Sequence, residues 1–239
     1  MEKVIITIPA FEPDMRLLKL VRRLKNDFCD IIVVDDGSQT SGDVFSSLRD
    51  IDGVITLTHD SNRGKGAALK TAFAEILRRF PDAVGTVTAD ADGQHLPEDI
   101  VRIAQSLVDN PSRLSLGVRT FPKGIPFRSR LGNLWTIAEF RLLTGHCVRD
   151  TQTGLRGIPL SLLPRALNIS GNRYDYEIRM LANAVLSAGD PVQIPIAAVY
   201  EDGNTASHFR PLADTISTQR ALFAETFIAR RGSRSHASG

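Results

Sequence analysis

Short apolar runs alternate with segments of helical spacing through the first half of the chain. Apolar runs of this length, bounded by turn residues, favour buried strands, whereas apolar residues at every third or fourth position favour helices. Strands that alternate with helices form right-handed βαβ units and a mostly parallel sheet. The sequence therefore predicts an α/β fold with a mostly parallel open sheet flanked by helices. The predicted strands are residues 4–8, 31–34, 54–57, 83–88 and 114–118, and the predicted helices between them are residues 15–24, 44–48, 64–77 and 97–107.

The second half of the chain is less regular. Residues 121–130 contain two prolines, a glycine, a lysine and two arginines, which predicts a mobile basic loop. Residues 150–157 form a polar segment punctuated by glycines. We expect residues 1–230 to form a single domain and residues 231–239 to be a disordered basic tail. The other predicted elements are helices at residues 131–143, 174–186 and 211–230, and a strand at residues 192–199.

Composition excludes several classes of protein. The net charge of the 239 residues is only +2, which gives no reason to expect a nucleic-acid partner. Cys29 and Cys147 lie far apart, so a zinc site or disulfide framework has no support and reduced thiols in the cytoplasm are expected. The N-terminal apolar run is too short for a signal peptide, and no apolar stretch is long enough for a transmembrane segment. A lipid substrate would therefore be met at the membrane surface.

Four polar segments follow predicted strands directly. In open parallel sheets, ligands bind beyond the carboxyl ends of the strands. Residues 9–12, 35–38, 60–66 and 89–95 should therefore share one edge of the sheet.

The most informative of these segments contains Asp90 and Asp92. Side chains two positions apart in an extended segment point to the same side, so both carboxylates can converge on one cation. Mg²⁺ is bound by one or two carboxylates together with phosphate oxygens of a substrate. Gln94 and His95 follow within reach. A solvated acidic loop that caps the next helix is the alternative.

Two other segments offer contacts for a nucleotide. Asp35 and Asp36 end the second predicted strand, where they could either form an Asx turn or accept hydrogen bonds from a nucleobase or ribose. Residues 62–69 open a helix with two glycines and Lys65, and exposed N–H groups at a helix start favour phosphate. Neither GxxxxGK[ST] nor GxGxxG after the first strand is present, which disfavours a Walker-type NTPase and a dinucleotide dehydrogenase.

These motifs occur in an order that resembles the family 2 glycosyltransferases, whose fold is the Rossmann-like GT-A fold. The similarity is carried by Ile-Pro-Ala at residues 8–10, Val-Val-Asp-Asp-Gly-Ser at 33–38, residues 62–69, and Asp-Ala-Asp-Gly-Gln-His at 90–95. Three later segments, residues 117–119, 150–157 and 207–210, resemble the dolichyl- or polyprenyl-phosphate mannosyl- and glucosyltransferases within that family.

The resemblance implies a role for each matching residue. Mg²⁺ or Mn²⁺ would be the cofactor, and it would bind the diphosphate of a nucleotide-diphosphate sugar. This sequence departs from the family pattern in two ways. Glu12 stands where many relatives carry asparagine, and we expect none of the transmembrane helices that many relatives carry. The implied residues are Asp90, Asp92 and Gln94 for the metal; Pro9, Ala10, Glu12, Asp35, Asp36, Lys65, Asp90 and Arg210 for the nucleotide sugar; Arg119, Arg128, Arg130 and Arg156 for the acceptor phosphate; and Asp92, Arg119 and Arg130 for catalysis.

The expected reaction is an inverting, in-line transfer of a hexose, mannose or glucose, to a polyprenyl phosphate in cell-envelope glycan biosynthesis. A phosphate acceptor is ionised at neutral pH and needs no general base. Arginine side chains can bind it through hydrogen bonds and leave it ionised. The basic segment at residues 123–130 would bind that phosphate and rest on anionic headgroups. The enzyme would work at the inner face of the membrane. Its predicted final helix could lie on the bilayer, pair with a second copy or an anchoring partner, or dock on its own core.

Three alternatives stay open. A soluble family 2 enzyme acting on a sugar hydroxyl would need a carboxylate base, for which Asp175 and Glu177 are candidates. A sugar-phosphate nucleotidyltransferase would release pyrophosphate. A nucleotide-binding module would have no activity. The residues do not decide the sugar or choose between GDP and UDP.

Overall fold

The computed structural model describes residues 3–120 and 127–197, except for the side chains of residues 127–135 and Tyr174. The described residues form one mixed sheet of seven strands in the order β3-β2-β1-β4-β6-β5-β7. All neighbouring strands are parallel except β6, which is antiparallel to both β4 and β5. The predicted α/β, mostly parallel open sheet is therefore confirmed. The strands are β1 Val4–Ala10, β2 Ile31–Asp35, β3 Val54–Thr58, β4 Gly85–Thr88, β5 Ser115–Thr120, β6 Arg156–Pro159 and β7 Val192–Ala197.

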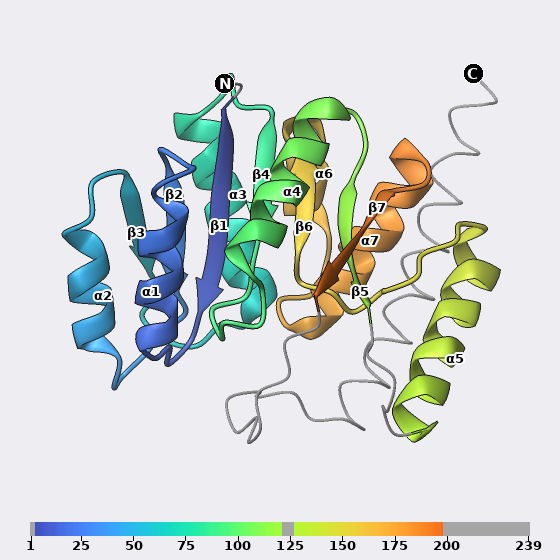
Figure 1. Cartoon of the computed structure of the whole chain (residues 1–239), viewed down its shortest axis with the longest axis horizontal. Helices are drawn as coiled ribbons and strands as arrows, with labels where there is room; N and C mark the ends of the chain where they lie inside the picture. The colour runs from blue at the N-terminus through green and yellow to red at the C-terminus, as the bar shows by residue number, and fades with distance from the viewer. Residues whose placement is uncertain (1–2, 121–126, 198–239) are drawn as a thin grey trace.

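Helices cover both faces of this sheet (Figure 1). On one face α1, α2 and α4 lie against the strands, and on the other face α3 packs on β1 and β2 beside α6 and α7. The helices are α1 Met15–Leu24, α2 Gly42–Arg49, α3 Lys65–Arg79, α4 Pro97–Asp109, α5 Phe127–Thr144, α6 Leu163–Asn168 and α7 Tyr174–Ala188, with a 3₁₀ turn at Leu160–Leu162.

Strand β1 shows how the sequence builds the two cores. Every residue of β1 is buried, and successive side chains point to opposite faces of the sheet. Ile6 and Ile8 pack with Leu17 of α1, whereas Ile5 belongs to the core on the other face with Phe73 of α3. A strand that is buried on both faces needs a continuous apolar run, which is why this strand is evident in the sequence.

Two predictions for the second half of the chain were wrong. The basic segment was expected to be a loop up to residue 130, but α5 already begins at Phe127. The prolines and glycine that suggested a loop all precede that residue, while arginine and leucine after it are good helix formers. The polar segment at 150–157 ends in a strand, β6, that we did not expect. The first part of the predicted loop, residues 121–126, lies outside the described residues.

The predicted helix at residues 131–143 and the helix at 174–186 are confirmed as α5 and α7. The strand at 192–199 is confirmed for Val192–Ala197. The helix predicted at 211–230 and the tail at 231–239 lie outside the described residues. In the described part of the chain, no helix combines the length and apolarity needed to cross a membrane.

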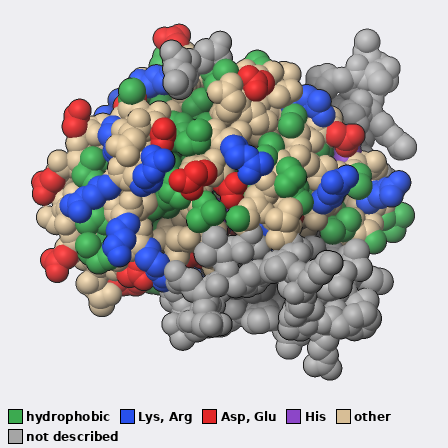
Figure 2. All heavy atoms as spheres, in the orientation of Figure 1, with side chains coloured by type: hydrophobic (Ala, Val, Ile, Leu, Met, Phe, Trp, Pro, Cys, Tyr) green, Lys and Arg blue, Asp and Glu red, His purple; other side chains and the backbone are tan. Residues whose placement is uncertain are grey.

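Charged side chains on the face formed by α1, α2 and α4 are mixed in sign. Figure 2 shows Lys and Arg side chains interspersed with Asp and Glu over these helices, rather than gathered by sign. Several of them are paired on the surface, for example Arg23 of α1 with Asp27, just after that helix, and with Glu98 at the start of α4. Surface pairs of this kind add little to stability, but they leave no large basic patch among the described side chains of this view.

Candidate active site

The four polar segments predicted to share one edge of the sheet do meet there. Backbone N–H of Asp36 donates to the carbonyl oxygen of Ala10 at 2.8 Å, which joins the ends of β2 and β1. His59, after β3, contacts Asp36 with its Nδ1 at 2.7 Å. Lys65, which begins α3, lies 2.6 Å from Asp90, which follows β4. These contacts place the candidate residues at the carboxyl ends of four neighbouring strands.

Asp36 organises the loop between β3 and α3. Its carboxylate is 3% exposed and accepts hydrogen bonds from backbone N–H of Arg63 at 3.0 Å and Gly64 at 2.8 Å. The His59 ring then links it to Thr71 of α3, whose hydroxyl lies 2.9 Å from Nε2. In the structure the hydrogen bonds of Asp36 hold the loop that leads to Lys65, and its binding of a nucleoside stays a prediction.

Asp35 and Glu12 shape the neighbouring turn. Asp35 is buried and accepts the N–H of Ser38, three residues on, at 2.8 Å, so its carboxylate stabilises this turn. Backbone N–H of Glu12 donates to the Ser38 hydroxyl at 2.9 Å. The Glu12 carboxylate accepts from the N–H of Gln39 at 2.6 Å and from the Thr40 and Ser41 hydroxyls.

These hydrogen bonds explain two unusual properties of Glu12. Its φ is +49°, a conformation that is uncommon for residues other than glycine and that the surrounding contacts maintain. The hydroxyl of Thr40 and the N–H of Gln39 lower the pKa of Glu12 to about 2. Glu12 therefore fastens the segment at 39–41 instead of pointing a free carboxylate at a ligand.

Replacing Glu12 with glutamine should destabilise the fold by about 1 kcal/mol at neutral pH, because hydrogen bonds to an ionised acceptor are stronger than those to a neutral one. The folded-state pKa lies below the ordinary value of 4.5, so the extra stability is present above pH 4.5 and is lost as the pH falls toward 2. Denaturant unfolding of wild type and Glu12→Gln from pH 7 to pH 3 measures this. Glu98→Gln, at an exposed carboxylate, is the control; a difference that stays constant with pH would contradict the role of Glu12.

Pro9 and Ala10 form the end of β1. Both are buried, and they pair in register with Val34 and Asp35 of β2. They were predicted to line the nucleoside pocket. Their place at the carboxyl end of the strand is compatible with backbone contacts to a nucleoside, whereas the Ala10 side chain belongs to the core.

The turn after β4 carries the predicted metal ligands. The side chain of Asp90 is 27% exposed, and Asp92 is partly buried and accepts the N–H of Gln94 at 3.0 Å. His95 is buried, and its Nδ1 accepts the N–H of Asp90 at 3.0 Å. Its Nε2 lies 3.8 Å from the Asp90 carboxylate. Burial lowers the pKa of His95, so the neutral ring acts as a brace under the turn.

Lys65 links Asp90 to a third carboxylate. Its Nζ lies 2.6 Å from Asp90 and 2.9 Å from Glu177 of α7. Burial opposes both charges, but the two carboxylates raise the pKa of Lys65, and its ammonium holds the pKa of Asp90 well below the usual range. Both groups are therefore ionised at neutral pH.

The donor atoms in this turn fit a hard divalent cation. Asp90, Asp92 and Gln94 offer oxygen ligands, which Mg²⁺ and Mn²⁺ prefer. A Cβ at Gly154 would lie 2.5 Å from an Asp90 oxygen, so glycine there leaves the space that the carboxylate occupies. Asp90 already holds a cation, the Lys65 ammonium. Among the described residues no three His, Cys, Asp or Glu side chains form a complete metal site by themselves, so a substrate phosphate would have to complete the coordination.

Arg119, at the end of β5, is one of the arginines predicted for the acceptor. Its guanidinium forms a two-pronged ion pair with Asp150, at 2.7 Å and 3.0 Å. The Asp150 side chain is almost fully buried, whereas that of Arg119 is 30% exposed. Burial lowers the pKa of His95, and the charges of Lys65 and then Arg119 act in the same direction.

Arg156, the first residue of β6, lies deeper than the sequence suggested. It is 1% exposed, and its guanidinium donates to the carbonyl oxygens of Thr153 at 2.9 Å, Glu177 at 2.6 Å and Thr151 at 3.4 Å. Burial lowers its pKa, while nearby carboxylates oppose that shift. This geometry favours a role in holding α7 and the segment before β6 together over direct contact with an acceptor.

The remaining predicted residues cannot be placed in the site. The side chains of Arg128 and Arg130 in α5, and all of Arg210, lie outside the described residues. Two important partners were not part of the predicted site. Asp150 lies in a motif that we had noted, and Glu177 was considered only as a base for a hydroxyl acceptor. Their contacts depend on the fold, so no local signal in the sequence reveals them.

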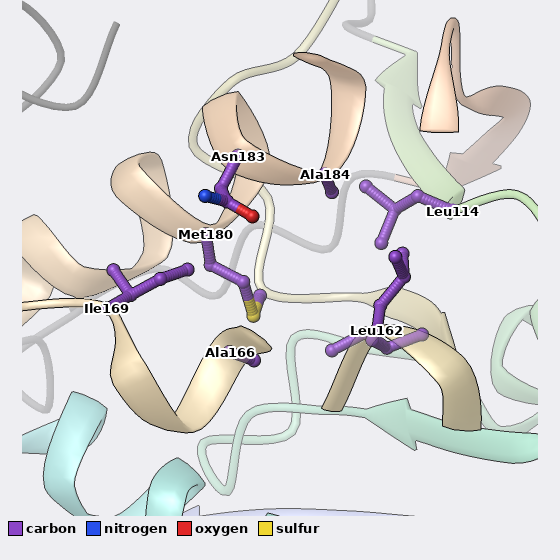
Figure 3. A pocket seen from close by; sticks show the side chains of 8 residues that line it. Leu114, Leu162, Ala166, Ile169, Met180, Asn183 and Ala184 are labelled. Carbon is purple, nitrogen blue, oxygen red and sulfur yellow. The ribbon is translucent and has the colours of Figure 1, made fainter. Parts of the chain in front are cut away.

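A small apolar pocket lies beside α6 and α7, away from the candidate site (Figure 3). Leu114, which lines it, stands directly before β5 and so at the amino end of that strand. Seven of its eight lining side chains are apolar, and Asn183 is the polar one. It offers nothing to bind a diphosphate or a cation, so we assign it no ligand.

Comparison with known proteins agrees with this geometry. An archaeal enzyme from Methanococcus voltae, UDP-N-acetylglucosamine--dolichyl-phosphate N-acetylglucosaminyltransferase, is 27% identical over 225 residues, which cover 85% of this chain and 88% of that protein. The polyprenol monophosphomannose synthase of Mycolicibacterium smegmatis is 27% identical over 206 residues, covering 82% and 77% of the two chains.

Solved structures confirm the fold. The glucosyl-3-phosphoglycerate synthase of Mycobacterium tuberculosis, in complex with Mn²⁺, UDP-glucose and phosphoglyceric acid, superimposes with a TM-score of 0.67 at 17% identity. The match covers 95% of this chain and 79% of that one. The model of glycosyl transferase family 2 matches residues 5–167, well over half of the sequence. This chain therefore belongs to glycosyl transferase family 2.

Proposed function

We propose that this chain is an inverting, metal-dependent hexosyltransferase that moves mannose or glucose from a nucleotide-diphosphate sugar to a polyprenyl phosphate. The observation that carries the proposal is that three carboxylates near the candidate site are each paired with a cationic side chain. Glu177, Asp150 and Asp175 each lie within ion-pair distance of a lysine or an arginine.

This pairing favours a phosphate acceptor over a hydroxyl acceptor. A hydroxyl nucleophile needs a general base within hydrogen-bond reach, whereas each of these three carboxylates is already engaged by a lysine or an arginine. A phosphate monoester has a second pKa of about 6 and is already largely ionised at neutral pH. It can attack without a base, provided that cations hold it in place.

In this proposal, one cationic group would hold the acceptor and another would hold the donor. Asp150 fixes the plane of the Arg119 guanidinium, which would orient a phosphate at this position. Lys65 lies beside Asp90 at the start of α3, where a diphosphate would meet exposed N–H groups. Asp90 and Asp92, with Gln94, would hold Mg²⁺ or Mn²⁺, which when bound neutralises charge on the departing nucleoside diphosphate.

The relatives support the acceptor class but leave the sugar open. The two named above are described as acting with dolichyl phosphate and as making a polyprenol monophosphomannose, and they differ in the sugar. A polyprenyl acceptor requires the reaction to take place at a membrane surface, which we place at the cytoplasmic face.

The proposal is tested by offering the full-length protein a short-chain polyprenyl phosphate in detergent with Mn²⁺ and either GDP-mannose or UDP-glucose. We expect one donor to yield a glycolipid and the free nucleoside diphosphate, and free sugars to yield no product. Transfer to free sugars with none to the lipid would point to the hydroxyl-acceptor enzyme. Pyrophosphate release from a nucleoside triphosphate and a sugar phosphate would point to a nucleotidyltransferase.

A further inference from the structure

Lys65 is held at a fixed point between two helices and the metal-binding turn. Gly66, next to it in α3, packs against Tyr176 of α7 so closely that a Cβ would lie 2.5 Å from the Tyr176 Cβ. Backbone N–H of Ala67 donates to the carbonyl oxygen of Asn172 at 3.1 Å. The backbone at the start of α3 is therefore fastened to the start of α7, and only the lysine side chain is free to change its position.

The Lys65 ammonium occupies a carboxylate that a divalent cation would also need. Its Nζ lies 2.6 Å from Asp90, which is one of the two carboxylates of the candidate metal site. A cation and an ammonium cannot share one carboxylate oxygen without strong repulsion. Metal binding should therefore require Lys65 to release Asp90.

Glu177 offers Lys65 a second partner. The Glu177 carboxylate lies 2.9 Å from the same Nζ and is 12% exposed, so the ammonium can leave Asp90 and still be paired. Without that partner, a largely buried ammonium would have to stay on Asp90, because an unpaired buried charge is costly.

We propose, on the basis of the function proposed above, that Glu177 is a positioning residue that holds Lys65 away from Asp90 when the metal binds and keeps it within reach of the donor diphosphate. Glu177 would then control the competition between Lys65 and the metal for Asp90, and would act on the reaction only through Lys65. This role differs from that of a general base, for which Glu177 would have to contact the acceptor.

Mn²⁺ binding without any acceptor tests this role. The dissociation constant is measured by electron paramagnetic resonance of free Mn²⁺ for wild type, Lys65→Met, Glu177→Gln and the double variant. We expect Lys65→Met to tighten Mn²⁺ binding about five-fold and Glu177→Gln to weaken it about five-fold, with the double variant behaving like Lys65→Met. The loss of the Glu177→Gln effect in the double variant is what distinguishes positioning through Lys65 from simple removal of a charge.

Two further variants complete the design. Asp175→Asn removes a charge from the same helix without touching Lys65 and should change Mn²⁺ affinity less than two-fold if competition, rather than net charge, decides the outcome. Glu177→Asp keeps a carboxylate and should restore part of the lost affinity. Thermal unfolding of each variant confirms that it is folded. If Lys65→Met does not fold, the Mn²⁺ affinities of Glu177→Gln, Glu177→Asp and Asp175→Asn are compared instead. Weaker binding by Glu177→Gln alone supports the role of Glu177, and equal weakening by Asp175→Asn contradicts it.

Nucleoside diphosphates supply the second readout. GDP and UDP are titrated by calorimetry with Mn²⁺ present, and Lys65→Met should weaken binding of the preferred one about ten-fold. Equal weakening of Mn²⁺ binding by Glu177→Gln in the wild-type and Lys65→Met backgrounds would overturn the role of Glu177. Failure of wild type to bind Mn²⁺ with either nucleoside diphosphate would instead count against the proposed function.

Discussion

Asp92→Ala is expected to lower kcat for sugar transfer about 10²- to 10³-fold, because it removes one of the two carboxylates that would hold the cation against the leaving diphosphate. Asp92 lies in the turn after β4, where its carboxylate accepts the N–H of Gln94 within the same turn, so its loss should disturb the fold little. The measurement is the initial rate at saturating donor, across a range of Mn²⁺ concentrations.

Asp82→Ala is the matched control for that variant. Asp82 is an exposed aspartate in the turn at the other end of β4, so its replacement should leave the rate unchanged. The two variants together separate loss of a ligand from loss of an acidic residue in a turn next to the same strand. Full activity of Asp92→Ala, with an unaltered response to Mn²⁺, would show that the metal is assigned to the wrong residues.

Arg156→Met should lower the free energy of unfolding by about 3–5 kcal/mol, because breaking a buried charged network leaves uncompensated groups behind. The variant would leave the carbonyl oxygens of Thr153, Glu177 and Thr151 without their donor. Guanidinium chloride unfolding of wild type and variant measures the loss.

Arg149→Met provides the comparison, since Arg149 is an exposed arginine just before the same segment and should change stability by less than about 0.5 kcal/mol. The result also decides between two roles for Arg156. A small loss of stability together with a large increase in KM for the acceptor would mean that Arg156 grips the acceptor phosphate, as its sequence motif first suggested.

The strands that could be predicted from the sequence are those whose own residues determine their state. β1 and β2 are buried on both faces and therefore appear as unbroken apolar runs. β6 has only four residues, and these include a glycine and a proline, which are poor strand formers. It forms because β4 and β5 pair with it on both sides, and that environment cannot be seen in a short window of sequence.

The same distinction applies to the site. Asp90, Asp92 and Lys65 could be identified because each belongs to a compact motif after a strand. The ion pairs of Lys65 with Glu177 and of Arg119 with Asp150 could not, because they join distant segments that only the folded sheet brings together. Asp36 and Glu12 carry the right chemistry for a ligand, but the structure directs their carboxylates to backbone N–H groups and to nearby His and hydroxyl side chains.

The pairing of β6 has a consequence for how the acceptor side of the enzyme can change. A Cβ at Gly85 would strike the carbonyl of Ile158, and a Cβ at Gly157 would lie 3.1 Å from Ile103 and Ser115, so β6 cannot slide along β4 to absorb an added residue. An insertion or deletion between α5 and β6 must therefore be taken up by the connection that contains Asp150. Lengthening that connection would shift the anchor of Arg119 while Asp90 and Lys65 stayed in place. Under the function proposed above, acceptor preference would then diverge without a change in the residues assigned to the donor.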